Sequence, residues 1–269
     1  MQPAPPAPPL VTLTTDFGSN DAYVGQLKGA LLRACPRAMP VDICHTVPRG
    51  DIVAAAITIA TSYAFFPDNT IHLVVVDPEV GGDRAILAAE ADSHRFIAPD
   101  NGVLSLLVRD RRLTAVHQVD LVPFGAASPT FHGRDIMAPV AGRLAGGLAL
   151  SAVGPAMAAD RLRTVPIPAA QRTAHGLQGQ VLHIDHFGNL RTSIRPAADR
   201  LDWEHVVCLE IRGRRIDRQA RHYSEAPTGE LLALVDSAGY LEIAANQDSA
   251  ARLLGSLPGD PVLVRTAPA

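Results

Sequence analysis

The sequence predicts an α/β protein in two parts: an N-terminal three-layer α/β domain with a mostly parallel sheet, and a smaller C-terminal antiparallel β domain, either a sandwich or a barrel. In the first half of the chain, β-branched apolar runs alternate with helical patterns, which is typical of a parallel sheet covered by helices. Beyond residue 154 this pattern gives way to a proline-containing stretch and then to short, evenly spaced strand-like runs. We therefore expect an N-terminal domain over residues 10–154, a linker over 155–176 and a C-terminal domain over 177–269.

The first expected strand, residues 10–13, is followed by a polar loop over 14–21 and by a helix with Val24, Leu27 and Leu31 on its inner face. Either Asn20 or Asp21 is suited to cap that helix. After a later loop over 99–102, Asn101 is similarly suited to cap a short helix. The other elements expected in this half are strands at 41–44, 71–76, 86–91 and 94–98, and helices at 51–65 and 135–150.

The second half predicts a β domain with little helix. Turn residues separate its apolar runs, as expected for antiparallel strands. The expected strands are 180–185, 190–194, 206–211, 231–235, 240–244 and 261–265, with one short helix at 249–254.

Composition excludes several classes of protein. The net charge is -3 and no long basic block occurs, so we expect no nucleic-acid partner. No apolar stretch is long and clean enough to span a membrane, and residues 1–9 lack the features of a signal peptide. Cys35, Cys44 and Cys208 are scattered, with neither zinc spacing nor a disulfide pattern, which favours the reducing cytoplasm.

The end of the strand at 71–76 is the strongest candidate for a functional site. Asp77 and Pro78 follow directly, and Arg84 comes seven residues after Asp77. Charged groups at the mouth of a buried strand are costly unless they are paired, and the carboxyl ends of strands are where ligands bind in α/β proteins. His132 adds a possible acid–base group. The alternative is a structural ion pair that closes a turn, beside an ordinary loop histidine.

Polar loops in both halves supply candidate ligand-binding residues. Asp16 has two acceptor oxygens for ribose hydroxyls, and Asp21 could hold a substrate ammonium; both could equally be loop and cap residues. Phe187 and Asn189 suit a purine, through stacking and a donor–acceptor amide, and Ser237 could bond a polar ligand end. The alternative for these three is turn geometry. The first strand is not followed by Gly-x-Gly-x-x-Gly, and no phosphate-loop motif occurs.

Taken in order, these motifs resemble those of the adenosine-forming S-adenosyl-L-methionine (SAM) hydrolases, also called SAM hydroxide adenosyltransferases, which are relatives of fluorinase and chlorinase. The resemblance runs from about Val11 to the C-terminal strand. It rests on Thr15-Asp16-Phe17-Gly18 with Asp21 and Tyr23, Asp77-Pro78 through Arg84, Pro99-Asp100-Asn101-Gly102, Phe131-His132-Gly133-Arg134-Asp135, Asp185 through Asn189, and Ser237 through Ala244 with Asn246.

The resemblance implies hydrolysis of SAM to adenosine and L-methionine, through attack of water or hydroxide at C5′ of the ribose, without a metal or other cofactor. It also implies a homotrimer whose active sites lie between the N-terminal domain of one subunit and the C-terminal domain of its neighbour. Asp77, Arg84 and His132 would position and activate the water. The implied substrate-binding residues are Asp16, Asp21, Phe131, Asp185, Phe187, Asn189, Ser237 and Ala244.

The chain departs from the family pattern at a few positions. Halide-using relatives carry a serine where this chain has Gly133 and a tyrosine where it has Asp77, which disfavours a halide as nucleophile. Glu79 and Gly82 stand where glycine and threonine are usual, and a positive φ at Glu79 would strain the loop. Two alternative functions are a metal-dependent phosphoesterase, with Asp16, Asp21, Asp77 and His132 as ligands, and a non-catalytic protein that binds SAM or adenosine.

Overall fold

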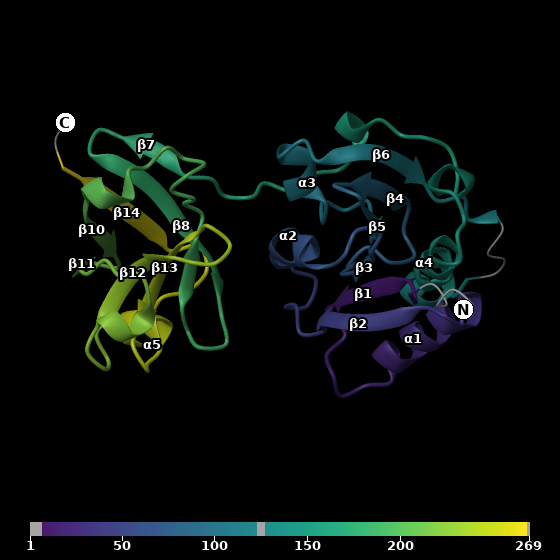
Figure 1. The fold of residues 1–269 in the computed structure, drawn as a ribbon, viewed down its shortest axis with the longest axis horizontal. Coiled ribbons are helices and arrows are strands. Elements are labelled where there is room, and N and C mark those ends of the chain that lie inside the picture. The colour runs from purple at the N-terminus through teal and green to yellow at the C-terminus, as the bar shows by residue number, and fades with distance from the viewer. Residues whose placement is uncertain (1–6, 123–126, 268–269) are drawn as a thin grey trace, which may run out of the picture. The chain divides into compact units, whose positions relative to one another are not determined.

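The computed structural model describes residues 7–122 and 127–267. The chain divides into two compact units, the N-terminal unit Met1–Ile167 and the C-terminal unit Pro168–Ala269 (Figure 1). Each unit has the predicted fold class, since the first contains a mixed sheet with helices and the second an antiparallel sheet. The boundary between the units lies between Ile167 and Pro168.

The N-terminal unit is built on a six-stranded sheet with the order β2-β1-β3-β5-β4-β6. Its first four strands in that order are parallel, whereas β4 is antiparallel to both β5 and β6. The edge strand β6 was not predicted from the sequence. The strands are β1 (Leu10–Thr15), β2 (Met39–Cys44), β3 (Ile71–Val75), β4 (Ile86–Ala91), β5 (His94–Pro99) and β6 (Leu113–Gln118).

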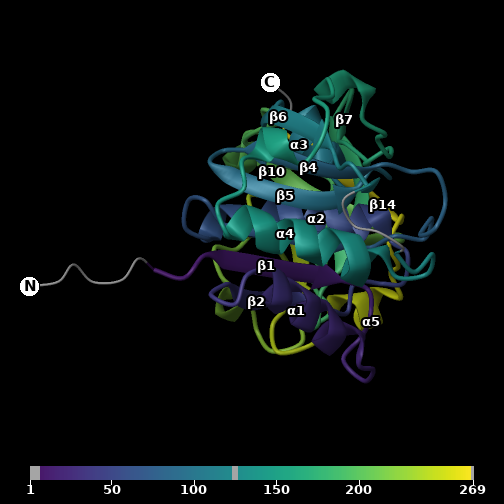
Figure 2. The same cartoon turned by 90° about the vertical axis from the view of Figure 1, so that its right-hand side faces the viewer.

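Helices cover both faces of this sheet, which confirms the three layers. On one face, α1 and α4 pack against Leu13 and Leu73, and Figure 2 shows α4 in front of the sheet. On the other face, α2 and α3 pack against Val74 and Phe96. Alternate residues of β3 therefore enter different cores, as the two-residue period of a strand requires. The helices are α1 (Tyr23–Ala34), α2 (Ile52–Ser62), α3 (Ser105–Arg109), a π-helical turn (Gly133–Met137) and α4 (Ala138–Ala145).

The two side-chain caps expected from the sequence are absent, whereas α2 has a cap that was not predicted. The Asp51 side chain caps α2 by accepting a hydrogen bond from the Ala54 N–H at 2.8 Å. The expected capping of α1 by Asn20 or Asp21 is wrong, because Ala22 is the N-cap and no side chain bonds the first turn. Asn101 likewise does not cap α3, whose N-cap is Leu104. The helix expected over 135–150 begins earlier, as a π-helical turn, and ends before two consecutive glycines.

The C-terminal unit is an antiparallel sheet that curls into a nearly closed barrel. Its strand order is β11-β10-β14-β8-β9-β13-β12, and β7 pairs with β8 outside this path. All six predicted strands and the short helix are present, whereas β7 and β11 were missed. The elements are β7 (Gln171–Thr173), β8 (Gly176–Ile184), β9 (Leu190–Thr192), β10 (Val206–Ile211), β11 (Arg214–Ile216), β12 (Leu231–Val235), β13 (Leu241–Ala245), α5 (Ala250–Leu254) and β14 (Pro261–Thr266).

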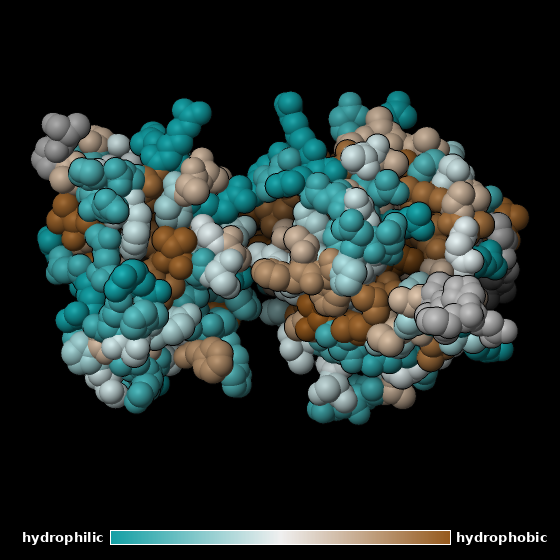
Figure 3. Space-filling view, in the orientation of Figure 1, coloured by the Kyte–Doolittle hydropathy of each residue, from teal (hydrophilic) through white to brown (hydrophobic). Residues whose placement is uncertain are grey.

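Within residues 7–122 and 127–267, no helix combines the length and the apolar character needed to cross a bilayer. The face drawn in Figure 3 mixes hydrophilic and hydrophobic residues in both units.

A pair of histidines is buried inside the N-terminal sheet. His72 Nδ1 pairs with the Thr12 hydroxyl at 2.7 Å, and His72 Nε2 pairs with His94 Nδ1 at 3.1 Å. The His72 ring also stacks on Phe96. Burial, and to a lesser degree the neighbouring His94, lower the pKa of His72 to about 3. His72 is therefore neutral in the folded protein at neutral pH.

This buried pair predicts a loss of stability in acid. Between pH 6.5 and about 3 the unfolded chain protonates His72 while the folded chain does not, so the unfolded state binds more protons. The free energy of unfolding should fall by about 1.4 kcal/mol per pH unit on acidification because of this one group. Urea unfolding from pH 7 to 4.5 should show a shallower dependence for His72→Gln. The exposed His175→Gln should keep the wild-type slope, and equal slopes for all three proteins would contradict the assignment.

Candidate active site

Two carboxylates follow neighbouring parallel strands of the N-terminal sheet. Asp16 comes directly after β1, and Asp77 lies just beyond the end of β3. The register pairs Thr15 with Val75, so the two strands end side by side. The carboxyl ends of parallel strands therefore gather the predicted residues at one edge of the sheet, where α/β proteins bind their ligands.

Asp77 and Arg84 form a buried, bidentate ion pair. Arg84 Nε lies 3.0 Å and 2.9 Å from the two carboxylate oxygens of Asp77, and Arg84 Nη2 also donates to Oδ2. The Arg84 side chain is 1% exposed and that of Asp77 4%. Removing either charge would leave the other uncompensated, which is far more costly inside a protein than in water.

The loop between these residues accommodates Glu79 without strain. The positive φ of the turn falls on Gly81, at +83°, and not on Glu79. The Glu79 carboxylate instead accepts a hydrogen bond from Arg163 Nη1 at 3.1 Å, at the surface. A Cβ at Gly81 would lie 2.4 Å from the Pro129 carbonyl oxygen, so the turn packs tightly on the segment that leads to His132.

His132 precedes the π-helical turn and has an unusual environment. Its Nδ1 is buried and makes no hydrogen bond with any residue that the structure describes. Burial lowers the pKa of His132, and the positive charge of Arg84 lowers it further, against smaller opposing effects of Asp77 and Asp135. A neutral imidazole with a buried nitrogen of this kind is suited to bond a substrate or a water molecule, since such groups are costly when unsatisfied.

The backbone next to His132 lies directly against β3. A Cβ at Gly133 would approach Val75 Cγ1 to 2.8 Å, a distance that real Cβ contacts essentially never show. A serine at this position would therefore require Val75 to move.

Three aromatic rings connect the Asp16 loop to the His132 loop. Phe17, Tyr23 and Phe131 meet edge to face, with centroids 5.5 to 5.9 Å apart. Asp16 itself accepts a hydrogen bond from the Gly50 N–H at 2.9 Å. Asp21 is exposed in the same loop. The N-terminal unit thus brings Asp16, Asp77, Arg84, Phe131 and His132 to one edge of the sheet.

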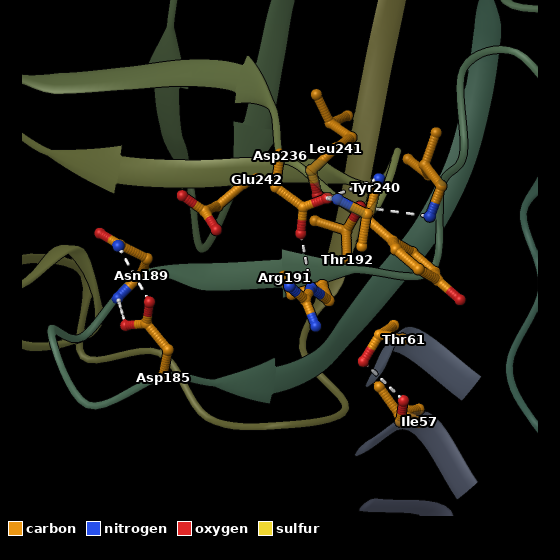
Figure 4. A network of polar contacts seen from close by, with 12 residues as sticks. Ile57, Thr61, Asp185, Asn189, Arg191, Thr192, Asp236, Tyr240, Leu241 and Glu242 are labelled. Carbon is orange, nitrogen blue, oxygen red and sulfur yellow. Dashed lines mark hydrogen bonds and ion pairs between the residues drawn. The ribbon is translucent and has the colours of Figure 1, made fainter. Parts of the chain in front are cut away.

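In the C-terminal unit, Asp185 organises the loop that carries Phe187 and Asn189. Its Oδ1 accepts hydrogen bonds from the backbone N–H groups of Phe187 and Asn189 at 2.9 and 2.8 Å, and its Oδ2 accepts one from Asn189 Nδ2 at 3.1 Å. Figure 4 shows Asp185 and Asn189 facing one another. The side chain of Phe187 is left 73% exposed at the turn. Asp185 therefore acts on the loop, whereas the Phe187 ring faces outward.

The turn between β12 and β13 carries the other predicted residues of this unit. Asp236 accepts hydrogen bonds from the Ala238 and Tyr240 N–H groups and from Arg191 Nε, which leaves the adjacent Ser237 exposed (Figure 4). Ala244 is fully buried within β13, its backbone included.

Sequence reasoning missed a buried carboxylic acid on β13. Glu242 is 5% exposed and accepts a hydrogen bond from the Tyr223 hydroxyl at 2.9 Å. Burial raises the pKa of Glu242, and the nearby Asp185 and Asp236 raise it further. An acidic residue inside an otherwise apolar strand was the signal that could have revealed it.

The four residues considered as metal ligands do not converge. Within the described ranges, no group of three or more His, Cys, Asp or Glu residues is arranged to hold a metal ion. Asp77 is already engaged by Arg84 in a bidentate contact. Asp21 is exposed in the loop before α1.

Comparison with known proteins gives matches to both units. The family models described as SAM hydroxide adenosyltransferase N-terminal domain and C-terminal domain match residues 11–154 and 179–263. The (R)-S-adenosyl-L-methionine hydrolase of Salinispora arenicola is 38% identical over 264 residues, covering 95% of this chain and 97% of that protein. The corresponding hydrolase of Thermus thermophilus is 33% identical over 261 residues, covering 94% and 98%.

Two further relatives widen the comparison. The fluorinase of Nocardia brasiliensis is 27% identical over 277 residues, covering 90% of this chain and 92% of that protein. A solved structure of a conserved protein from Thermotoga maritima superimposes with a TM-score of 0.88 and 31% identity, covering 95% and 99% of the two chains. Sequence and fold similarity therefore extend over both units.

Because the Asp77–Arg84 pair is buried, Asp77 should contribute far more to the free energy of unfolding than Glu79 in the same loop. Asp77→Asn leaves a buried guanidinium without its counter-charge and should lower the free energy of unfolding by about 3–5 kcal/mol. Glu79→Gln removes an ion pair whose side chains are about half exposed, and should cost about 0–1 kcal/mol. Denaturant unfolding at pH 7 measures both. Equal losses for the two variants would show that the Asp77–Arg84 pair is not buried as described.

Proposed function

The chain belongs to the SAM hydroxide adenosyltransferase family, and from this we propose that it hydrolyses S-adenosyl-L-methionine to adenosine and L-methionine. The observation that carries the proposal is the buried Asp77–Arg84 pair next to a His132 imidazole with a lowered pKa. Together these groups offer a fixed cation and a neutral acceptor at the carboxyl edge of the sheet, as required to hold a water molecule for attack.

The reaction requires the protein mainly to position the reactants. The oxygen of water forms a bond to C5′ of the ribose, the C5′–sulfur bond breaks, and its electron pair passes to sulfur, giving the neutral thioether of methionine. The attacking water loses one proton, which is released to solvent, so that the positive charge of the sulfonium leaves as H⁺. Because a sulfonium leaves without being protonated, the enzyme must chiefly align water, C5′ and sulfur, and orientation alone can lower a barrier by about 7–11 kcal/mol.

We assign the water-handling roles to the three residues of the buried cluster. Arg84 stabilises the oxygen as it gains negative charge, and Asp77 fixes the direction of the guanidinium. His132 accepts a hydrogen bond from the water, and its lowered pKa keeps it able to accept one at neutral pH.

The substrate contacts are assigned to residues of both units. Asp16 binds the ribose hydroxyls, Phe131 covers the sugar, and Asp21 and Ser237 bind the methionine end. Phe187 stacks on the adenine and Asn189 bonds its edge, with Asp185 holding their loop. The exposure of Phe187 and Ser237 and the ordering of their loops by Asp185 and Asp236 support these roles.

The proposal also includes a cytoplasmic homotrimer. In it, the N-terminal unit of one subunit and the C-terminal unit of a neighbour jointly form each active site. The division of the candidate residues between two units supports such shared sites, because neither unit alone carries groups for both the water and the adenine.

Purified protein incubated with SAM should release adenosine and L-methionine, measured by chromatography, and ¹⁸O from labelled water should appear in the 5′-hydroxyl. Arg84→Ala should lower kcat by about 100- to 1,000-fold, and His132→Ala by about 100-fold or more. His175→Ala, at an exposed site in the other unit, should leave turnover unchanged. Activity should survive a chelator. Phosphatase activity that a chelator abolishes would favour the metal-dependent phosphoesterase instead, and tight SAM binding without turnover would favour the non-catalytic binding protein.

Shared active sites can be tested by mixing two inactive proteins. Arg84→Ala damages only the N-terminal half of a site and Asn189→Ala only the C-terminal half. After co-refolding or co-expression, mixed oligomers should contain some intact sites and regain part of the wild-type activity. Sedimentation should report trimers. Absence of any recovery in mixed oligomers of confirmed composition would indicate that each site is built from one subunit.

A further inference from the structure

One short loop holds both ends of the segment that carries the Asp77–Arg84 pair. Asn101 Nδ2 donates a hydrogen bond to the carbonyl of Val76, immediately before Asp77, at 2.9 Å. The Asp100 N–H donates to the carbonyl of Ala85, immediately after Arg84, at 2.9 Å. Two consecutive residues after β5 therefore close the 77–84 loop at its base.

The Asn101 amide has one possible orientation. Its Oδ1 accepts a hydrogen bond from the Val103 N–H at 3.2 Å, so its nitrogen must be the atom that faces Val76. The residue is 6% exposed, and water does not compete for these bonds. The amide thus links the last carbonyl of the β3 segment to the turn at 101–103.

Residues 163–165 contact the loop that carries Asp100 and Asn101. The Arg163 N–H donates to Asp100 Oδ1 at 2.9 Å, while the Arg163 guanidinium bonds Glu79 in the loop itself. Gly102, at φ +100°, lies so close to Val165 that a Cβ would meet it at 2.6 Å. This backing leaves Asn101 little freedom to move away from Val76.

We infer that Asn101 is a positioning residue for the hydrolysis: it fixes the Val76 carbonyl and thereby the direction from which the Asp77 carboxylate holds Arg84. Asn101 acts only through Asp77 and Arg84. The expected effect on kcat rests on the proposed function. The effect of the Asn101 amide on the geometry of the Asp77–Arg84 ion pair does not depend on it.

Asn101→Asp gives a sharp test because it changes one atom of the contact. The remaining carboxylate oxygen still accepts from Val103, but the other would face the Val76 carbonyl, oxygen against oxygen. Protonation in acid restores an O–H donor at that position. We expect kcat to fall by about 100-fold at pH 8 with a much smaller change in KM, and to recover relative to wild type as the pH is lowered.

Ser105→Ala provides the matched control. Ser105 is also buried and also makes two hydrogen bonds, to the Gly102 carbonyl and from the Val165 N–H, but neither reaches the 77–84 loop. A comparable loss of thermal stability is expected from both variants, with the change in kcat and its recovery in acid confined to Asn101→Asp. Equal effects of both variants on kcat, or a wild-type kcat for folded Asn101→Asp at pH 8, would overturn the inference.

A spectroscopic measurement separates this inference from the proposed function. In protein with ¹⁵N-labelled arginine, the Nε–H of Arg84 should give a resonance protected by its bond to Asp77. That resonance should shift or broaden in Asn101→Asp at pH 8, return in acid, and stay unchanged in Ser105→Ala. An unchanged resonance in Asn101→Asp, or failure of this variant to fold even in acid, would contradict the inference. If wild-type protein does not hydrolyse SAM, the proposed function fails, while the resonance still decides the role of Asn101.

Discussion

The ion pair between Asp77 and Arg84 is the constraint to which the rest of the N-terminal site conforms. A guanidinium that is 1% exposed can remain charged only if a carboxylate meets it with good geometry, because the cost of removing both charges from water is several kcal/mol per ion. The surrounding contacts preserve that geometry. Gly81 allows the turn to pack on Pro129, and Gly133 brings the His132 segment against Val75. Such a pair adds little net stability compared with apolar residues of the same volume, so its presence at a strand end is better explained by function.

The predictable parts of the fold are those determined by local pattern. The apolar run that ends at Val76 indicated a buried strand, and the apolar repeat after Asp51 indicated α2, since both signals are local in the sequence. The edge strand β6 was missed because only Val116 of its six residues is buried, which weakens the apolar pattern. The capping expected for α1 and α3 failed because Asn and Asp serve many kinds of turn, and Asn101 bonds the end of β3 instead.

The candidate site was predictable as a set of residues, but its internal connections were not. Asp77, Arg84 and His132 could be named because charged groups after a buried strand need a reason to be there. The contacts of Glu79 with Arg163 and of Asn101 with Val76 span 84 and 25 residues of chain, and no local pattern encodes such pairings. Glu242 was missed for a related reason. Its neighbours Tyr223, Asp185 and Asp236 come from three separate segments that only the folded barrel brings together.

The charges of the site suit a cationic substrate. A sulfonium would be repelled by an isolated arginine, and within a few ångströms that repulsion is worth about 1 kcal/mol in water and several times more in a protein. The Asp77 carboxylate cancels the charge of Arg84 while leaving the guanidinium in place to donate hydrogen bonds. The lowered pKa of His132 has a matching effect, since a protonated imidazole would add a second positive charge. The same burial and the same arginine that hold His132 neutral also keep it able to accept a hydrogen bond from water. A neutral cluster rich in donors and acceptors can therefore tolerate the sulfonium of the substrate and still stabilise the oxygen that displaces it.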